Sequence, residues 1–329
     1  MLPPPAEGPY FDELAVGQEF GGAPGITLTS GLAATHQAIT GDRLALVTDH
    51  ELCREVTGGA PLASPGLVWD VAIGQSTVVT QHVKANLFYR GLAFRRAPQI
   101  GDTLTTMTQV VALRQNAPRD GRASTGLAAL RIMTADQERR PVLDFWRCAM
   151  LPLRDQAAQT GNADDLSEVG RDAPPPDFEA PVIGWRLDKF RAAGPRPADL
   201  VAGQSFEVAG GDVVSSAPEL ARLTANIAAV HHDRNAAGGE RLVYGGHAIG
   251  LALSQATRAL PSIVTVTGWH ACEHLAPVRE GDTLRSAITI EEVDYLPDGG
   301  GLVHLRSLVR ADGPDARDVL DWRYVAVVA

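Results

Sequence analysis

The sequence predicts an α+β protein in which one domain occurs twice, each copy placing helices before an antiparallel sheet. Two observations support this prediction. Short motifs recur in the same order in the two halves of the 329-residue chain. Within each half, a helical pattern is followed by runs of β-branched residues that Gly, Asp and Pro separate. Helices followed by consecutive strands are typical of an α+β fold with an antiparallel sheet.

Four pairs of short motifs carry the duplication. A single pair has little weight, but four collinear pairs at a slowly changing offset indicate two copies of one domain. The pairs are 17–20 with 203–206, 101–104 with 281–284, 126–131 with 301–306, and 142–144 with 319–321. We therefore assign residues 1–153 to an N-terminal domain and residues 198–329 to a C-terminal domain. Residues 154–197, rich in Ala, Asp, Gly and Pro, are predicted to be a linker.

Both copies are expected to follow one order of elements. In the C-terminal copy, residues 216–219 match a capping box, and apolar residues of 220–230 lie on one helical face. A second helix is expected over 248–260, with Gly245 and Gly246 at its N-terminus. The expected strands there are 263–269, 283–293, 302–309 and 319–328. The N-terminal copy is expected to have a helix over 67–76 and strands over 78–87, 103–113, 124–134 and 142–153.

Charge and composition exclude several classes of protein. The formal net charge of −10 argues against a nucleic-acid-binding protein, which needs a basic surface. No apolar run approaches the ~18 residues of a membrane-spanning helix. The first nine residues lack the basic and apolar regions of a signal peptide, so we expect a cytoplasmic protein without a membrane partner. Cys53, Cys148 and Cys272 are odd in number and widely spaced, which predicts buried thiols.

A histidine motif precedes the second helix of the C-terminal copy. Asn226, His231 and Asp233 are followed by residues 241–247, Arg-Leu-Val-Tyr-Gly-Gly-His. This pattern resembles the MaoC-like dehydratase family, whose hydratases carry Asp, then His five residues on, then Asp two further. The resemblance spans nearly the whole chain. It implies a tandem, or double, hotdog fold, in which each copy wraps a long helix with an antiparallel sheet.

A closer resemblance is to the mesaconyl-CoA hydratases, also called β-methylmalyl-CoA dehydratases. It rests on residues 112–116, Asn226 with His231, residues 243–247, and His274 three residues before Pro277. It implies a hydro-lyase that reversibly hydrates a 2-enoyl-CoA or dehydrates a 3-hydroxyacyl-CoA, with mesaconyl-CoA and β-methylmalyl-CoA as the narrower expectation. The partner would be an acyl-CoA thioester. Coenzyme A would be part of the substrate, and neither a further cofactor nor a metal is expected.

The catalytic residues that this resemblance implies are His231, Asn226, Gly245 and Gly246. An imidazole exchanges protons near neutral pH, which suits His231 to act as acid and base. A backbone N–H at a helix N-terminus stabilises negative charge on a thioester oxygen, the role implied for Gly245 or Gly246. Asn226 replaces the family's Asp, and an amide can orient water but cannot take up its proton. His231 is then the sole acid and base, or the site binds acyl-CoA without turning it over.

Three further residues are candidates for substrate binding. His247 and His274 could meet a carboxylate of the substrate, and Arg241 could contact a phosphate of coenzyme A. Ordinary polar packing is the competing interpretation for each. In the N-terminal copy, Asp42 occupies the place of the asparagine but Val47 replaces the histidine, which predicts a degenerate site.

Three other functions stay open from the sequence. One is an (R)-specific enoyl-CoA hydratase acting on fatty acyl chains. The second is a thioesterase, against which Asn226 speaks because that chemistry usually needs a carboxylate aimed at the thioester. The third is a non-catalytic double hotdog that binds acyl-CoA. Because one duplicated chain already resembles a pair of hotdog domains, a monomer and a homodimer are both open.

Overall fold

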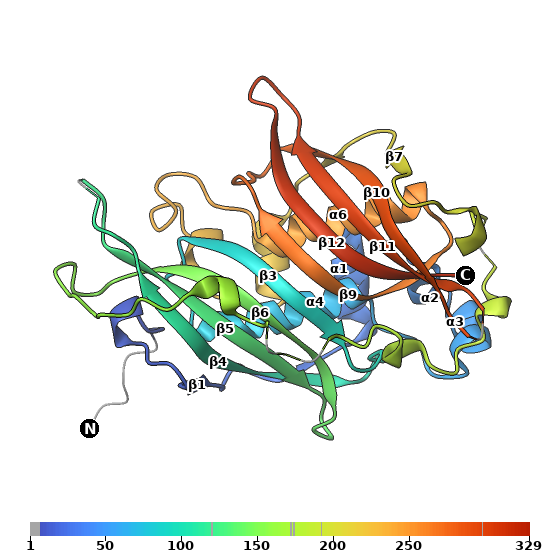
Figure 1. Ribbon diagram of the computed structural model, residues 1–329, viewed down its shortest axis with the longest axis horizontal. Coiled ribbons are helices and arrows are strands. Elements are labelled where there is room, and N and C mark those ends of the chain that lie inside the picture. Colours follow the sequence, from blue (N-terminus) through green and yellow to red (C-terminus); the bar gives the residue numbers. More distant parts are fainter. Residues whose placement is uncertain (1–6, 120, 172, 174, 192, 298) are drawn as a thin grey trace.

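The computed structural model describes residues 7–119, 121–171, 173, 175–191, 193–297 and 299–329. In these residues, twelve strands form one antiparallel sheet (Figure 1). Its order is β1-β4-β5-β6-β3-β9-β12-β11-β10-β7, with β2 beside β4 and β8 beside β10. The strands of the two sequence copies therefore occupy separate halves of the sheet, which join where β3 pairs with β9.

The bounds of the elements follow the order of the chain. The first half contains η1 (Phe11–Glu13), β1 (Glu19–Phe20), β2 (Ile26–Thr27), α1 (Ser30–Thr40), α2 (Ala45–Thr48), α3 (His50–Thr57), α4 (Pro65–Gln75), η2 (Ser76–Val78), β3 (Ala85–Phe94), β4 (Thr103–Gln115), β5 (Thr125–Ala135) and β6 (Pro141–Pro152). Four short 3-10 helices connect the halves: η3 (Leu166–Glu168), η4 (Ala180–Val182), η5 (Leu187–Lys189) and η6 (Pro197–Asp199). The second half contains β7 (Ser205–Glu207), β8 (Asp212–Val213), α5 (Ala217–Leu223), η7 (Ala229–His231), α6 (Gly245–Ala259), β9 (Ile263–His274), β10 (Thr283–Tyr295), β11 (Gly301–Ala311) and β12 (Arg317–Val328).

Helices α4 and α6 form the centre of the two halves. Helix α4 is buried along its whole length, as expected for a helix that is mostly apolar around its circumference, and its two polar side chains, Asp70 and Gln75, have hydrogen-bond partners. It packs on β4, β5 and β9, whereas α6 packs on β10, β11 and β12. The two helices also contact each other. One continuous core therefore connects the two sequence copies.

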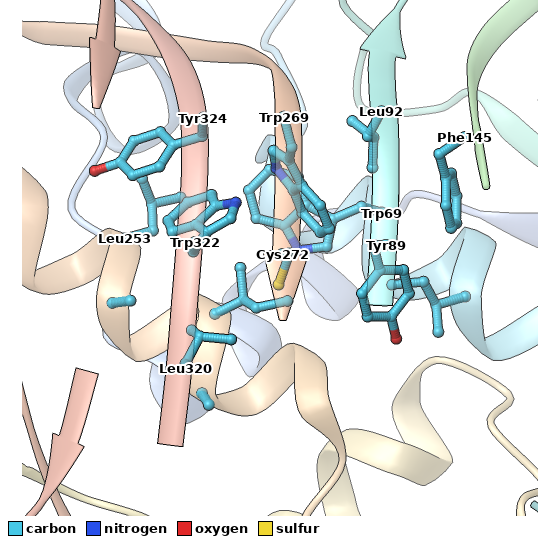
Figure 2. Packing of buried hydrophobic residues seen from close by; sticks show 14 of the residues in the cluster. Trp69, Tyr89, Leu92, Phe145, Leu253, Trp269, Cys272, Leu320, Trp322 and Tyr324 are labelled. Carbon is cyan, nitrogen blue, oxygen red and sulfur yellow. The ribbon is translucent and has the colours of Figure 1, made fainter. Parts of the chain in front are cut away.

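A cluster of indole rings lies where the halves meet (Figure 2). Trp69 of α4 packs edge-on against Trp269 of β9, with ring centroids 4.9 Å apart. Trp269 in turn packs against Trp322 of β12 at 5.8 Å. All three side chains are fully buried. Each such aromatic pair contributes about 0.5–1.5 kcal/mol beyond its buried area, so this cluster stabilises the junction between the halves.

The first helix predicted for the C-terminal copy begins where expected, after Ser216, but it is shorter than predicted and lacks the predicted cap. Helix α5 ends at Leu223, and Ile227 is 43% exposed rather than part of a buried face. Ser216 has a left-handed backbone and its side chain makes no capping hydrogen bond, so the predicted capping box is absent. The helix stops because Ala225 adopts φ +55°, a left-handed conformation that a helix cannot include. The three helices α1, α2 and α3 were not predicted.

Most predicted strands are confirmed. The four strands of the C-terminal copy appear as β9 to β12, and the last three of the N-terminal copy appear as β4 to β6. The strand predicted over 78–87 is wrong, because residues 76–78 form the 3-10 helix η2 and the strand begins only at Ala85. Thr77 favours the helical turn, since its hydroxyl donates to the Gly74 carbonyl at 2.6 Å. The helix predicted over 248–260 is confirmed as α6, which begins at Gly245.

The cysteines and the connecting segment complete the fold. The three cysteines are free, buried thiols, as predicted. Residues 154–197 contribute buried side chains to the fold, among them Leu166, Phe178, Val182 and Leu187. None of the helices in the described ranges has both the length and the apolar character to cross a membrane.

Candidate active site

A cavity of about 710 Å³ opens between the two halves of the molecule. Its buried floor is formed by Ile73 of α4, Tyr89 of β3, Arg147 of β6, and Tyr244 and Ala248 at the start of α6. Its rim includes exposed residues such as Lys84, Asn235, Leu275 and Pro277. No Asp or Glu is among the described residues that line it. The cavity is therefore lined by cations, amides, imidazoles and apolar groups.

His231 lines this cavity at the end of η7. Its Nδ1 lies 2.8 Å from the Leu242 carbonyl oxygen, which can only accept, so Nδ1 carries the proton. The other ring nitrogen, Nε2, therefore holds a free lone pair. Burial lowers the pKa of His231 to about 4, so the ring is neutral at pH 7 and able to accept a proton.

Asn226 also lines the cavity, and its position depends on the end of α5. The left-handed backbone of Ala225 turns the chain so that the Asn226 Oδ1 accepts from the Ala228 N–H at 3.0 Å. His232 is partly buried and donates from Nε2 to the Asn226 carbonyl oxygen at 2.6 Å. Among the described residues Nδ2 has no acceptor, so the amide can act on a ligand as a donor through Nδ2.

Gly245 begins α6 and lines the same cavity. The first N–H groups of a helix have no intrahelical acceptor, so the Gly245 N–H is available to a ligand oxygen. A Cβ at this position would lie 2.4 Å from His274 Nε2. Glycine therefore lets the His274 imidazole lie close against the start of α6, a reason that sequence analysis did not supply.

His274, at the end of β9, forms the wall beside Gly245. Its ring packs edge-on against Tyr89 with centroids 5.8 Å apart. Its Nε2 is buried without a hydrogen-bond partner among the described residues. Burial, with a smaller effect of His231, lowers the pKa of His274 to about 4. Two neutral imidazoles thus border the helix start.

Three of the seven candidate residues lie outside the cavity. A Cβ on Gly246 would meet Asp70 Oδ1 at 2.0 Å, so this glycine permits close packing of α6 on α4. His247 is fully buried away from the cavity. Arg241 lies 3.6 Å from a carboxylate oxygen of Glu280. None of the three is among the described residues that line the cavity, so their roles in catalysis and binding stay predictions from the sequence.

Comparison with known proteins shows which enzymes this chain is similar to in sequence. No protein-family model matches it. It is 28% identical to the β-methylmalyl-CoA dehydratase of Chloroflexus aurantiacus over 288 residues, which cover 84% of this chain and 80% of the relative. It is 25% identical to the mesaconyl-CoA hydratase of Cereibacter sphaeroides over 316 residues, which cover 94% of this chain and 91% of the relative.

Solved structures agree with these relatives. A predicted MaoC domain dehydratase of Chloroflexus aurantiacus has a TM-score of 0.85 at 24% identity, covering 98% of this chain and 97% of its own, and shows the fold alone. A conserved hypothetical protein of Mycobacterium tuberculosis, described as essential for bacterial survival during infection and as a double hotdog, is 54% identical with a TM-score of 0.91. That match covers 97% of this chain and 98% of the other. The chain belongs to the MaoC-like double-hotdog family. The α+β double hotdog expected from the sequence is therefore confirmed.

In the N-terminal hotdog, Asp42 stands at the position that corresponds to Asn226, and its carboxylate is hydrogen-bonded within that hotdog. Asp42 follows Gly41, whose φ of +70° parallels the left-handed Ala225 of the other copy. The Asp42 Oδ1 accepts from the Leu44 N–H at 2.9 Å, and its Oδ2 accepts from the Ser64 hydroxyl. This carboxylate is occupied at the N-terminus of α4 and does not line the cavity.

Sequence analysis missed two polar residues that this double hotdog places in the cavity floor. Arg147 and Tyr89 belong to the N-terminal hotdog, yet they face the same cavity as His231. One signal for Arg147 was present: it stands alone as a charge in the apolar stretch 145–151, Phe-Trp-Arg-Cys-Ala-Met-Leu. No signal in the sequence could show that this strand lies beside the C-terminal site.

Proposed function

We propose that this protein reversibly adds water across a 2-enoyl-CoA, or removes water from a 3-hydroxyacyl-CoA. One observation carries the proposal: a neutral imidazole with a free Nε2 lines the same cavity as the unoccupied N–H at the start of α6. The names of the two curated relatives support the same reaction class. They also make mesaconyl-CoA and β-methylmalyl-CoA the narrower substrates that we propose.

In the hydration direction, His231 Nε2 takes a proton from water while the water oxygen bonds to the β-carbon of the enoyl group. The electron pair of the double bond moves toward the thioester, whose oxygen becomes negative. The Gly245 N–H and the dipole of α6 stabilise that charge. The imidazolium then returns its proton to the α-carbon, so that His231 ends neutral. Dehydration follows the same steps in reverse.

Asn226 acts in this scheme as a donor that orients the water. Its Oδ1 is already bound to the Ala228 N–H, so Nδ2 is the atom that can hold the water oxygen. An amide cannot share the proton transfer, so within the Asn226–His231 pair the acid and base is His231. General acid–base catalysis by one positioned side chain contributes about 10²- to 10⁴-fold.

A thioesterase is the weaker alternative because of the cavity lining. That reaction usually needs a carboxylate directed at the thioester, and the described lining residues include none. A non-catalytic binder of acyl-CoA would keep the cavity but would leave the enoyl double bond unchanged.

The test is a spectrophotometric assay of the enoyl-thioester absorbance with a panel of 2-enoyl-CoA substrates that includes mesaconyl-CoA. We expect absorbance to fall with at least one substrate, and His231→Gln to lower kcat by about 10²-fold or more. His50→Gln, which changes an exposed histidine outside the cavity, is the matched control and should keep full activity. Unchanged absorbance with every substrate, release of free thiol, or an active His231→Gln would overturn the proposal.

A further inference from the structure

Arg147 is a buried arginine that forms no ion pair with any described residue. It lies on β6 and is 3% exposed. Arg131 of the neighbouring strand β5, by contrast, has a carboxylate partner, because its Nη2 lies 3.3 Å from an Asp144 carboxylate oxygen. A buried cation without a counter-charge is costly, by several kcal/mol in a protein interior. Such a residue is therefore expected to have a function that requires its charge.

The hydrogen bonds of Arg147 occupy only one end of its guanidinium. Its Nη2 donates to the Ser76 carbonyl at 3.2 Å and to the Thr80 hydroxyl at 2.6 Å. These bonds fix the side chain at the end of η2. Its Nε has no acceptor among the described residues, and its Nη1 donates to none of them. Nη1 is therefore the nitrogen left to bind a ligand.

Arg147 belongs to the inner end of the cavity. It lines the cavity together with Ile73, Tyr89 and Tyr244, all of which are buried. The ring of Tyr89 packs near the indole cluster while its hydroxyl points away from that cluster (Figure 2). This phenol lies close enough to the guanidinium for each group to affect the pKa of the other. Arg147 and Tyr89 together present a cation and a hydroxyl to the cavity.

The charge of the lining fits an anionic group at this inner end. The described lining residues include cations and no carboxylate. Lys84 is exposed at the rim, where the phosphates of coenzyme A would remain in contact with water. With the thioester beside Gly245, the acyl group would extend toward the buried floor. The distal end of that acyl group would therefore lie near Arg147.

We propose that Arg147, with the Tyr89 hydroxyl, binds a free carboxylate on the acyl group, so that the N-terminal hotdog selects the substrate on which the C-terminal hotdog acts. Mesaconyl-CoA carries such a carboxylate, so Arg147 would be the residue by which this chain selects the narrower substrates that we propose. A guanidinium and a carboxylate form charge-assisted hydrogen bonds, which are about twice as strong as neutral ones. The expected difference in turnover rests on the proposed function, whereas the expected difference in binding does not.

The kinetic test compares two enoyl thioesters of equal length, fumaryl-CoA and crotonyl-CoA, which differ by a distal carboxylate in place of a methyl group. We expect the wild type to prefer fumaryl-CoA in kcat/KM. Arg147→Met should lower kcat/KM for fumaryl-CoA about 10- to 100-fold and change that for crotonyl-CoA less than about threefold. Arg147→Lys, which keeps the charge, should recover part of the preference. Arg131→Met is the matched control, because it removes an arginine of the neighbouring strand β5 that does not line the cavity, and it should retain the preference.

A binding measurement separates failure of this inference from failure of the proposed reaction. Calorimetry with succinyl-CoA and butyryl-CoA, which also differ by carboxylate against methyl, requires no turnover. We expect tighter binding of succinyl-CoA to the wild type and loss of that difference in Arg147→Met. If Arg147→Met does not fold, Arg147→Lys and Tyr89→Phe give the same comparison. Equal affinity of the wild type for the two thioesters, or equal losses for both in Arg147→Met, would overturn the inference. Hydration of crotonyl-CoA but not of fumaryl-CoA would also overturn it while leaving the proposed reaction intact.

Discussion

His247 provides a quantitative test of the interior of the protein. Its side chain is fully buried, and neither ring nitrogen has a hydrogen-bond partner among the described residues. Burial is the main reason that the pKa of His247 falls to about 4, with a smaller contribution from His36. We therefore expect His247→Leu to stabilise the protein, and to stabilise it more in acid than at neutral pH.

The magnitude follows from the difference in pKa between the folded and unfolded chains. The unfolded value is about 6.5, so the unfolded chain takes up the proton first as the pH falls. Stability is therefore complete above about pH 6.5 and is lost progressively as the pH falls toward 4. At 1.36 kcal/mol for each unit of pKa, this single group removes about 2 kcal/mol of the free energy of unfolding between pH 7 and pH 5. Leucine cannot be protonated, so the variant escapes this loss.

The assay is urea-induced unfolding of the wild type and of His247→Leu at pH 7 and pH 5. We expect the stability difference between the two proteins to be about 2 kcal/mol larger at pH 5. The buried His231 and His274 are present in both proteins, so their titration cancels in the comparison. His50→Gln, at an exposed position, should show no such dependence on pH. An equal difference at both pH values would refute the assignment of His247 as a buried, neutral imidazole.

Three further predictions test the junction, the N-terminal copy and the site. Gly74→Ala would place a Cβ 1.8 Å from the Thr224 carbonyl oxygen, and overpacking of this kind should cost about 3 kcal/mol of unfolding free energy in a urea titration. Ser64→Ala removes the partner of the Asp42 carboxylate and the side-chain cap of α4. It should lower the free energy of unfolding by about 1 kcal/mol and leave the KM for an enoyl-CoA unchanged. A large change in KM would place Ser64 in the site. Because His231 must be neutral to act as base, the hydration rate should fall as the pH falls through about 4, and a rate that rises there would contradict its role.

The family motif predicted four residues of the candidate site, all of them in the C-terminal copy of the domain, and none in the N-terminal copy. Asn226, His231, Gly245 and His274 were predicted as site residues, and all four line one cavity. Gly246 and His247 follow Gly245 directly in the chain, yet α6 directs them away from that cavity. A motif gives the order of residues but not the direction in which each one points from a helix. The sequence therefore could not show that Gly245 lines the cavity and that Gly246 and His247 do not.

The sequence by itself determined the duplicated α+β plan, most of the strands and the position of His231, the candidate acid and base. These features depend on local periodicity and on motifs that are contiguous in the chain. It did not reveal where α5 ends, because the left-handed Ala225 is an alanine and carries none of the signals of a glycine turn. Only the tertiary structure decided which residues face His231 across the cavity. Arg147 and Tyr89 come from the other copy of the domain, and they reach the site because β3 pairs with β9. Pairing between strands so distant in the chain depends on the packing of the whole molecule, which no local pattern records.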